Sequence, residues 1–294
     1  MESLLHTYSF QPYHAVYPEE RGHQISGNIQ VATDVHSPAL NNDRDILIYL
    51  PPSYFSETSE SVGQRYPVLY MHDGQNLFDP ATSFAGEWGV DEVLETLAYE
   101  TGLEAIVVGI PNSGKGRLDE YSPFHDPLRG GGKGNLYLSF IIHTLKPLID
   151  AHFRTLPEHR HTGLMGSSMG GLISLYGFFH REQVFGFAGV MSPSLWFGQG
   201  AIFDYVQNAP FVPGKIYLDV GTREQGGSMK SLRNLANSRR TYGGVRRMKR
   251  VLVRKGYRLN RQLLYVEERW AAHNEAAWSR RLPTALRFFL EMAN

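Results

Sequence analysis

The sequence of 294 residues contains no cysteine. This absence excludes disulfide bonds, thiolate metal sites and cysteine nucleophiles, so a covalent catalyst in this chain has to use another side chain. No stretch approaches the roughly 18 consecutive apolar residues of a membrane-spanning helix. Residues 1–26 also lack the basic region followed by an apolar region that marks a secretory signal. These absences predict a soluble, cytoplasmic protein without a membrane partner.

Net charge is also absent, because 29 basic and 29 acidic residues give a formal charge of zero. A neutral chain offers no phosphate-binding track, so nucleic acid is not an expected partner. The balance conceals an uneven distribution, since residues 223–261 contain 13 Lys or Arg and one acid, Glu224. We interpret the basic side chains of this segment as the solvated face of an amphipathic helix. The alternative is a positive rim that attracts an anionic ester.

Alternation of strand and helix patterns predicts the fold. Residues 27–36 and 45–50 indicate an opening hairpin, and short apolar runs with helical patterns between them follow toward the C-terminus. The expected later strands are 66–71, 105–110, 162–166, 187–191, 215–220 and 262–266. The order predicts one α/β domain over residues 1–294, with a mostly parallel sheet covered by helices on both faces.

Two features interrupt the expected helices. Pro147 lies inside the helix predicted over residues 135–153, where it removes a hydrogen bond and should kink the helix near His143. The pair Gly243 and Gly244 lies inside the basic segment and should divide it into two helices.

The stretch from Leu164 to Leu172 has the pattern of a nucleophile elbow. Gly166 and Gly170 remove Cβ atoms where a strand turns sharply into a helix, so Ser168 between them can be exposed in a strained conformation. An apolar strand pattern precedes this turn, and a helical apolar pattern follows it. Ser168 is therefore the candidate nucleophile.

A serine nucleophile needs a base that takes its proton and a carboxylate that orients the base. In α/β hydrolases these residues follow the chain order Ser, acid, His. Glu224 fits the acid, because it lies on a turn after the strand predicted over 215–220, and His273 fits the base on the loop before the last helix. The alternatives are Asp219 as the acid and His72 as the base.

Other parts of a hydrolase site follow from the same topology. The backbone N–H groups of Gln75 and Met169 are the expected oxyanion hole. His159 and His161 with Glu158 resemble a metal cluster only superficially, because no third ligand is evident beside the two histidines. We therefore expect no metal and no cofactor. Loops at the same sheet edge supply four candidate substrate contacts, namely Trp88, Arg117, Tyr121 and Trp196.

Four motifs together carry a resemblance, and they are YMHDGQNLF at 70–78, GSSMGG at 166–171, GTRE at 221–224 and HNEAAW at 273–278. The combination is similar to the "Putative esterase" family, which includes esterase D, feruloyl and acetylxylan esterases, siderophore esterases and the antigen 85 mycolyltransferases. The resemblance covers residues 27–292 and leaves 1–26 outside. It implies an α/β-hydrolase fold without a large lid and the same triad.

These patterns predict a serine carboxylesterase that acts on a small-molecule ester, with an anionic or aromatic ester as one interpretation. Ser168 would attack the ester carbonyl, His273 would transfer the proton, Glu224 would orient His273, and water would resolve the acyl-enzyme. An acyltransferase with the same triad is the alternative. A non-catalytic binding protein of the same fold is disfavoured, because the triad is complete.

Overall fold

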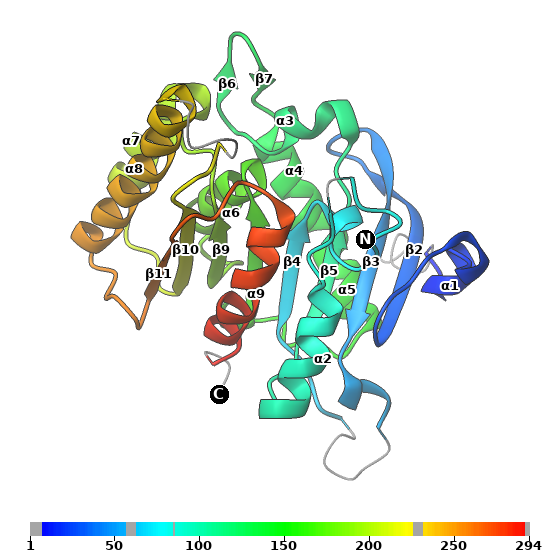
Figure 1. Ribbon diagram of the computed structural model, residues 1–294. Coiled ribbons are helices and arrows are strands. Elements are labelled where there is room, and N and C mark those ends of the chain that lie inside the picture. The colour runs from blue at the N-terminus through cyan, green and yellow to red at the C-terminus, as the bar shows by residue number, and fades with distance from the viewer. Residues whose placement is uncertain (1–7, 57–62, 85, 226–231, 292–294) are drawn as a thin grey trace.

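The computed structural model describes residues 8–56, 63–84, 86–225 and 232–291. A sheet of nine strands runs through its centre in the order β1-β2-β3-β5-β4-β8-β9-β10-β11 (Figure 1). The strands from β5 to β11 in this order are parallel, and β1, β2 and β3 add an antiparallel edge. Their bounds are β1 (Phe10–Pro12), β2 (Asn28–Ser37), β3 (Asn42–Leu50), β4 (Val68–His72), β5 (Ile106–Ile110), β8 (Thr162–Ser167), β9 (Phe187–Met191), β10 (Lys215–Gly221) and β11 (Leu263–Glu268).

Helices cover both faces of this sheet (Figure 1). The face under α2 (Val90–Thr101) and α9 (Glu275–Leu290) has its own apolar core, to which α1 (Tyr13–Val16) contributes. The other face packs against α4 (Gly134–Phe140), α5 (Lys146–His152), α6 (Met169–His180), α7 (Ala201–Asn208) and α8 (Leu232–Lys255). This arrangement confirms the α/β-hydrolase fold that the sequence predicts. None of the described helices is both long and apolar enough to cross a membrane.

The predicted irregularity near His143 takes the form of a π-helical segment, Ile141–Leu145, between α4 and α5. Pro147 then lies in the first turn of α5. A proline has no N–H to donate and clashes with the preceding turn, and the wider π-helical turn relieves both effects.

The break predicted at Gly243 and Gly244 is wrong, because α8 runs through both glycines without interruption. Val245, Met248 and Leu252 form one buried stripe of this helix and pack in the core beside β10. A glycine inside a helix costs about 1 kcal/mol, whereas burying one such side chain contributes roughly 1.5–3 kcal/mol. Tertiary burial therefore outweighs the local preference.

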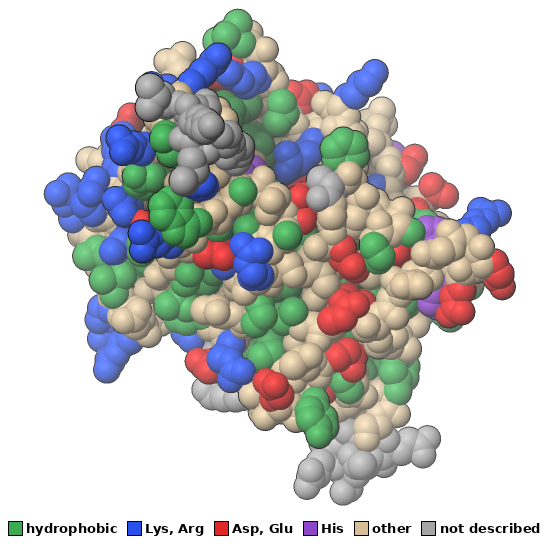
Figure 2. Space-filling model, viewed as in Figure 1, with side chains coloured by type: hydrophobic (Ala, Val, Ile, Leu, Met, Phe, Trp, Pro, Cys, Tyr) green, Lys and Arg blue, Asp and Glu red, His purple; other side chains and the backbone are tan. Residues whose placement is uncertain are grey.

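The basic side chains of α8 lie on its solvent side, and Figure 2 shows Lys and Arg gathered over this helix. Arg246 forms an ion pair with Glu267 at 2.6 Å, and the guanidinium of Arg247 stacks on Phe203. This burial pattern agrees with the amphipathic interpretation of the basic segment. Residues 226–231 of that segment lie outside the described residues.

Candidate active site

Ser168 lies between β8 and α6 with φ 56° and ψ −115°, a strained conformation for a residue with a side chain. The turn is tight on its inner side. A Cβ atom on Gly166 would lie 2.9 Å from Cδ2 of His72, and one on Gly170 would lie 3.2 Å from Cβ of the same histidine. Both positions therefore need glycine for close approach rather than for an unusual backbone angle, as the sequence predicts.

The end of the neighbouring strand β9 fixes the strained turn. The N–H of Ser168 donates to the carbonyl of Met191 at 2.9 Å, and the N–H of Ser194 donates to the carbonyl of Ser168 at 2.9 Å. The hydroxyl oxygens of Ser168 and Ser194 are 3.1 Å apart. These three contacts hold the Ser168 hydroxyl at the carboxyl ends of the parallel strands, where open α/β sheets bind ligands.

Glu224 and His273 form a hydrogen-bonded pair on the loops after β10 and β11. Oε2 of Glu224 accepts a hydrogen bond from Nδ1 of His273, and the N–H of His273 donates to the Glu224 carbonyl at 3.3 Å. The Glu224 carboxylate is fully buried, and its Oε1 accepts from the Gly221 N–H at 2.5 Å and from the Ser192 hydroxyl at 2.8 Å. With a proton on Nδ1, the second ring nitrogen of His273 is free to accept another.

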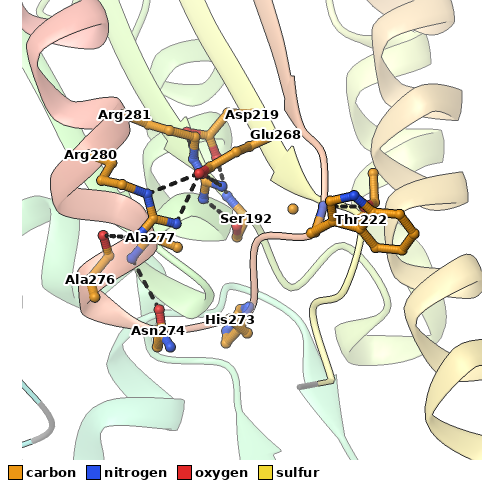
Figure 3. A network of polar contacts seen from close by, with 12 residues as sticks. Ser192, Asp219, Thr222, Glu268, His273, Asn274, Ala276, Ala277, Arg280 and Arg281 are labelled. Carbon is orange, nitrogen blue, oxygen red and sulfur yellow. Dashed lines mark hydrogen bonds and ion pairs between the residues drawn. The ribbon is translucent and has the colours of Figure 1, made fainter. Parts of the chain in front are cut away.

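Asp219, the alternative acid, has a different partner. Its Oδ2 accepts from Nε of Arg281 at 2.9 Å, and both side chains are buried. Burial raises the pKa of Asp219 to about 6, although the charge of Arg281 opposes this shift. Figure 3 shows Arg281 reaching from α9 to Asp219, Glu268 and Ser192, with His273 on a separate loop. The structure thus brings Glu224, and not Asp219, to His273.

His72, the alternative base, lies beneath the elbow. Only 1% of the residue is exposed, its Nδ1 is 2.8 Å from the Tyr137 hydroxyl, and burial lowers its pKa to about 3. The ring packs against the two elbow glycines, so it supports the turn from the core. A neutral, enclosed imidazole of this kind is a structural group.

Ser168 and His273 line one cleft with a volume of about 700 Å³. Gln75 also lines it, and the Gln75 side-chain carbonyl accepts the Asn112 N–H at 3.2 Å. Within the described part of the chain, no acceptor is hydrogen-bonded to the backbone N–H of Gln75 or of Met169. Both groups therefore lack a protein acceptor within the described residues, and of the two residues Gln75 lines the cleft.

Two of the four candidate substrate contacts lie in this cleft, namely Trp88 and Arg117. Arg117 is held by Asp73 through two hydrogen bonds of 2.7 Å each, so its charge is already paired. Tyr121 does not reach the cleft, because it is fully buried and its hydroxyl accepts the Asp73 N–H at 3.0 Å. Its position is a correction to the predicted contact with substrate.

Trp196 is the second correction, because it lines a different hollow of about 360 Å³ together with Arg240 and Arg247. Pro193 lines the same hollow, whereas the neighbouring Ser194 contacts Ser168. This loop therefore lies between the hollow and the elbow. The sequence predicts the sheet edge correctly for Trp196. It gives no indication of the side of the loop to which the indole turns.

Several residues around Ser168 and His273 are not among the predicted site residues. Ser192 and Ser194 follow a predicted strand at the functional edge, a position that could have indicated a role. Trp278 has no comparable signal, since its helical position is that of a core residue. Its ring contacts the imidazole of His273 edge-on, with centroids 5.0 Å apart, and also lies 5.7 Å from Trp88.

A mostly parallel sheet, a strained serine between a strand and a helix, and a histidine paired with a buried carboxylate on later loops define an α/β hydrolase. The chain belongs to the family described as "Putative esterase", whose model matches residues 37–289.

Curated relatives and solved structures agree with this family. The chain is 29% identical over 189 residues to the uncharacterized protein YbbA of Bacillus subtilis, covering 62% of this chain and 69% of that protein. It is also 29% identical over 165 residues to the siderophore triacetylfusarinine C esterase of Aspergillus fumigatus, a match that covers 53% of this chain and only 54% of the relative. The crystal structure of the BES protein from Bacillus cereus superposes with a TM-score of 0.67 at 22% identity, covering 90% and 96% of the two chains, which shows a shared fold.

Proposed function

We propose that this protein is a serine carboxylesterase whose nucleophile is Ser168. The observation that carries the proposal is that the strained Ser168 and His273 follow different strands and yet line one cleft, with the buried Glu224 hydrogen-bonded to the imidazole of His273 from behind. Membership of an esterase family supports the same reaction.

In the proposed mechanism the Ser168 hydroxyl attacks the ester carbonyl carbon, and its proton moves to Nε2 of His273. The carbonyl oxygen becomes an oxyanion, which the N–H groups of Gln75 and Met169 stabilise. Glu224 stabilises the imidazolium and keeps its Nδ1 proton in place. His273 then protonates the departing alcohol oxygen, and the ester bond breaks to leave an acyl-serine.

Water completes the cycle. His273 takes a proton from a water molecule that attacks the acyl carbonyl. The second tetrahedral intermediate then breaks its bond to Oγ of Ser168, His273 returns the proton to this oxygen, and a carboxylic acid and the free enzyme result. In an acyltransferase an alcohol would replace this water. Adding an acceptor alcohol separates the two activities, because an acyltransferase would convert part of the product from acid to ester.

The cleft suggests an ester with an aromatic group. Trp88, Trp278 and Phe84 line it, whereas the one guanidinium in its lining, that of Arg117, is paired with Asp73. Two relatives are named a siderophore enterobactin esterase, from Emericella nidulans, and an endo-1,4-beta-xylanase/feruloyl esterase, from Xylanibacter ruminicola. A panel of feruloyl, catecholate, acetylated-sugar and chromogenic esters tests this preference.

The nucleophile is tested by fluorophosphonate labelling and peptide mapping. We expect the label on Ser168, no label in Ser168→Ala, and a loss of turnover on the order of a million-fold in that variant. Ser167→Ala is the matched control, because Ser167 is the adjacent serine and lines the same cleft. A label on Ser167, or full labelling of Ser168→Ala, would overturn the assignment.

A further inference from the structure

Three carboxylates meet at the start of α2, on a side of the molecule that the proposed reaction does not use. Glu87, Asp91 and Glu92 each offer one oxygen, and these oxygens all lie within 4.8 Å of one another. Glu87 and Glu92 line a hollow of about 580 Å³ together with His23 and Ser26 of the N-terminal segment. Acidic side chains also gather on this part of the surface in Figure 2, over α2 and the N-terminal segment.

The helix end explains only part of this cluster. Acidic residues in a first helical turn gain roughly 0.3–1 kcal/mol from the helix dipole when they are exposed. Asp91 is instead fully buried, and although its Oδ2 accepts the Ser26 N–H at 2.6 Å, its Oδ1 has no hydrogen-bond partner within the described residues. Oε1 of Glu87 is shielded from solvent and also unpartnered. A buried carboxylate oxygen without a partner is costly and needs an explanation.

No protein cation compensates this charge. Among residues 8–56, 63–84, 86–225 and 232–291, no Lys or Arg forms an ion pair with any of the three carboxylates. The two histidines at the hollow have other acceptors, since His23 lies 2.8 Å from Asp79 and His14 lies 3.3 Å from Glu19. Negative charge is thus unfavourable here unless a cation lies beside it.

We propose that Glu87, Asp91 and Glu92 bind a calcium ion. The donors are all carboxylate oxygens, which favour hard cations over zinc or copper. An ion that contacts oxygens at about 2.4 Å can join two of them up to about 4.8 Å apart, and calcium bonds at 2.3–2.6 Å in flexible geometry whereas magnesium requires 2.0–2.1 Å. Oxygen separations of up to 4.8 Å therefore favour the longer and more flexible bonds of calcium over those of magnesium.

The position of the site gives calcium a structural effect. Ser26 donates through its N–H to Asp91 and through its hydroxyl to Glu92 at 3.0 Å, so an ion on these carboxylates would fasten the N-terminal segment to α2. Glu87 directly precedes Trp88, whose ring lines the active-site cleft. Calcium would accordingly stabilise the fold and the wall of the cleft, and it would take no part in the acyl transfer.

Calcium titration of the chelator-treated full-length protein tests the site by calorimetry and by thermal unfolding. A hundredfold excess over Kd should raise Tm by roughly 5–10 °C. Glu92→Gln, which changes an exposed residue, should weaken calcium binding about tenfold or more, because calcium affinity follows the number of charged ligands. Glu100→Gln is the matched control, since Glu100 is exposed on the same helix outside the cluster, and it should bind as the parent does.

Two outcomes would overturn the proposal. One is the absence of any calcium-dependent heat or Tm shift in the parent at millimolar calcium, which would mean that a shared proton holds the carboxylates together. The other is an equal calcium response in the parent and in both Glu92→Gln and Glu87→Gln, which would place the binding elsewhere. Neither outcome bears on Ser168, because labelling of the nucleophile is measured separately.

Discussion

Replacing each of the two candidate acids, Glu224 and Asp219, by its amide should affect catalysis in one variant and stability in the other. In Glu224→Gln the amide nitrogen can face Nδ1 of His273, which then has to accept rather than donate. The ring would present a protonated Nε2 to Ser168, and an imidazole in this tautomer cannot take the proton. We expect turnover to fall by about ten-thousand-fold, as in a triad whose carboxylate becomes an amide.

Asp219→Asn should have the opposite profile. It breaks a buried ion pair, a change that costs about 3–5 kcal/mol where the remaining charge is left without any partner. Arg281 keeps its second partner, Glu268, at 3.0 Å, so the cost should lie near 3 kcal/mol. For a large domain this corresponds to a decrease in Tm of roughly 6–12 °C. Turnover per folded molecule should stay within about tenfold of the parent, since no hydrogen bond joins Asp219 to His273 among the described residues.

The assay combines active-site titration, steady-state turnover and thermal unfolding on the same preparations. Active-site titration matters because a destabilised variant loses activity simply by unfolding. A Glu224→Gln enzyme with near-normal turnover, together with an Asp219→Asn enzyme that is stable but inactive, would refute the reasoning and transfer the role to Asp219.

Three further predictions concern the elbow, the buried histidine and the basic helix. Gly166→Ala should destabilise the protein by about 1–3 kcal/mol in urea unfolding, because the new Cβ meets His72 at 2.9 Å, and an unchanged midpoint would contradict the close packing. The pKa of His72 is about 3 in the folded protein and 6.5 when unfolded, so the unfolded chain binds more protons between these values. Stability should therefore fall by about 1.4 kcal/mol for each pH unit below 6.5 through this group, and His72→Gln should flatten that slope between pH 6.5 and 5. Reversing the charges of Arg246, Arg247 and Arg250 should leave the salt dependence of kcat/KM alike for an anionic and a neutral ester, because none of these three side chains lines the cleft. A steep salt dependence for the anionic ester alone, lost in the variant, would instead support the positive rim.

The sequence predicts the parallel strands well because they are short apolar runs bounded by turn residues, and all six lie within two residues of their expected ends. The two-residue period of a strand also puts Asp219 on the same side of β10 as Tyr217. The structure confirms this, since Tyr217 packs in the core with α9 and Asp219 pairs with Arg281 of that helix. Strand alternation is a local property, and it is readable without tertiary contacts.

The predictions that are wrong fail because they depend on tertiary contacts. The continuity of α8 across Gly243 depends on packing against β10, which no local pattern reveals. Tyr121 and Trp196 lie on the expected loops, yet the direction of each ring is set by the partner it finds, namely the Asp73 backbone and the Arg129 guanidinium. Strand β1 has only three residues and includes a proline, so it carries no strand signal in the sequence.

This short strand has a consequence for the association of the molecule with copies of itself. β2 is ten residues long. Without β1, the sheet would end at β2, whose outer N–H and C=O groups would be unpaired. Such an edge is a template on which a second chain could add a strand. β1 occupies part of that edge with three residues, and Pro12 removes one of its own donors. β1 thereby shortens the stretch of β2 that is open to a second chain, and its own shortness and proline make it a poor template for one.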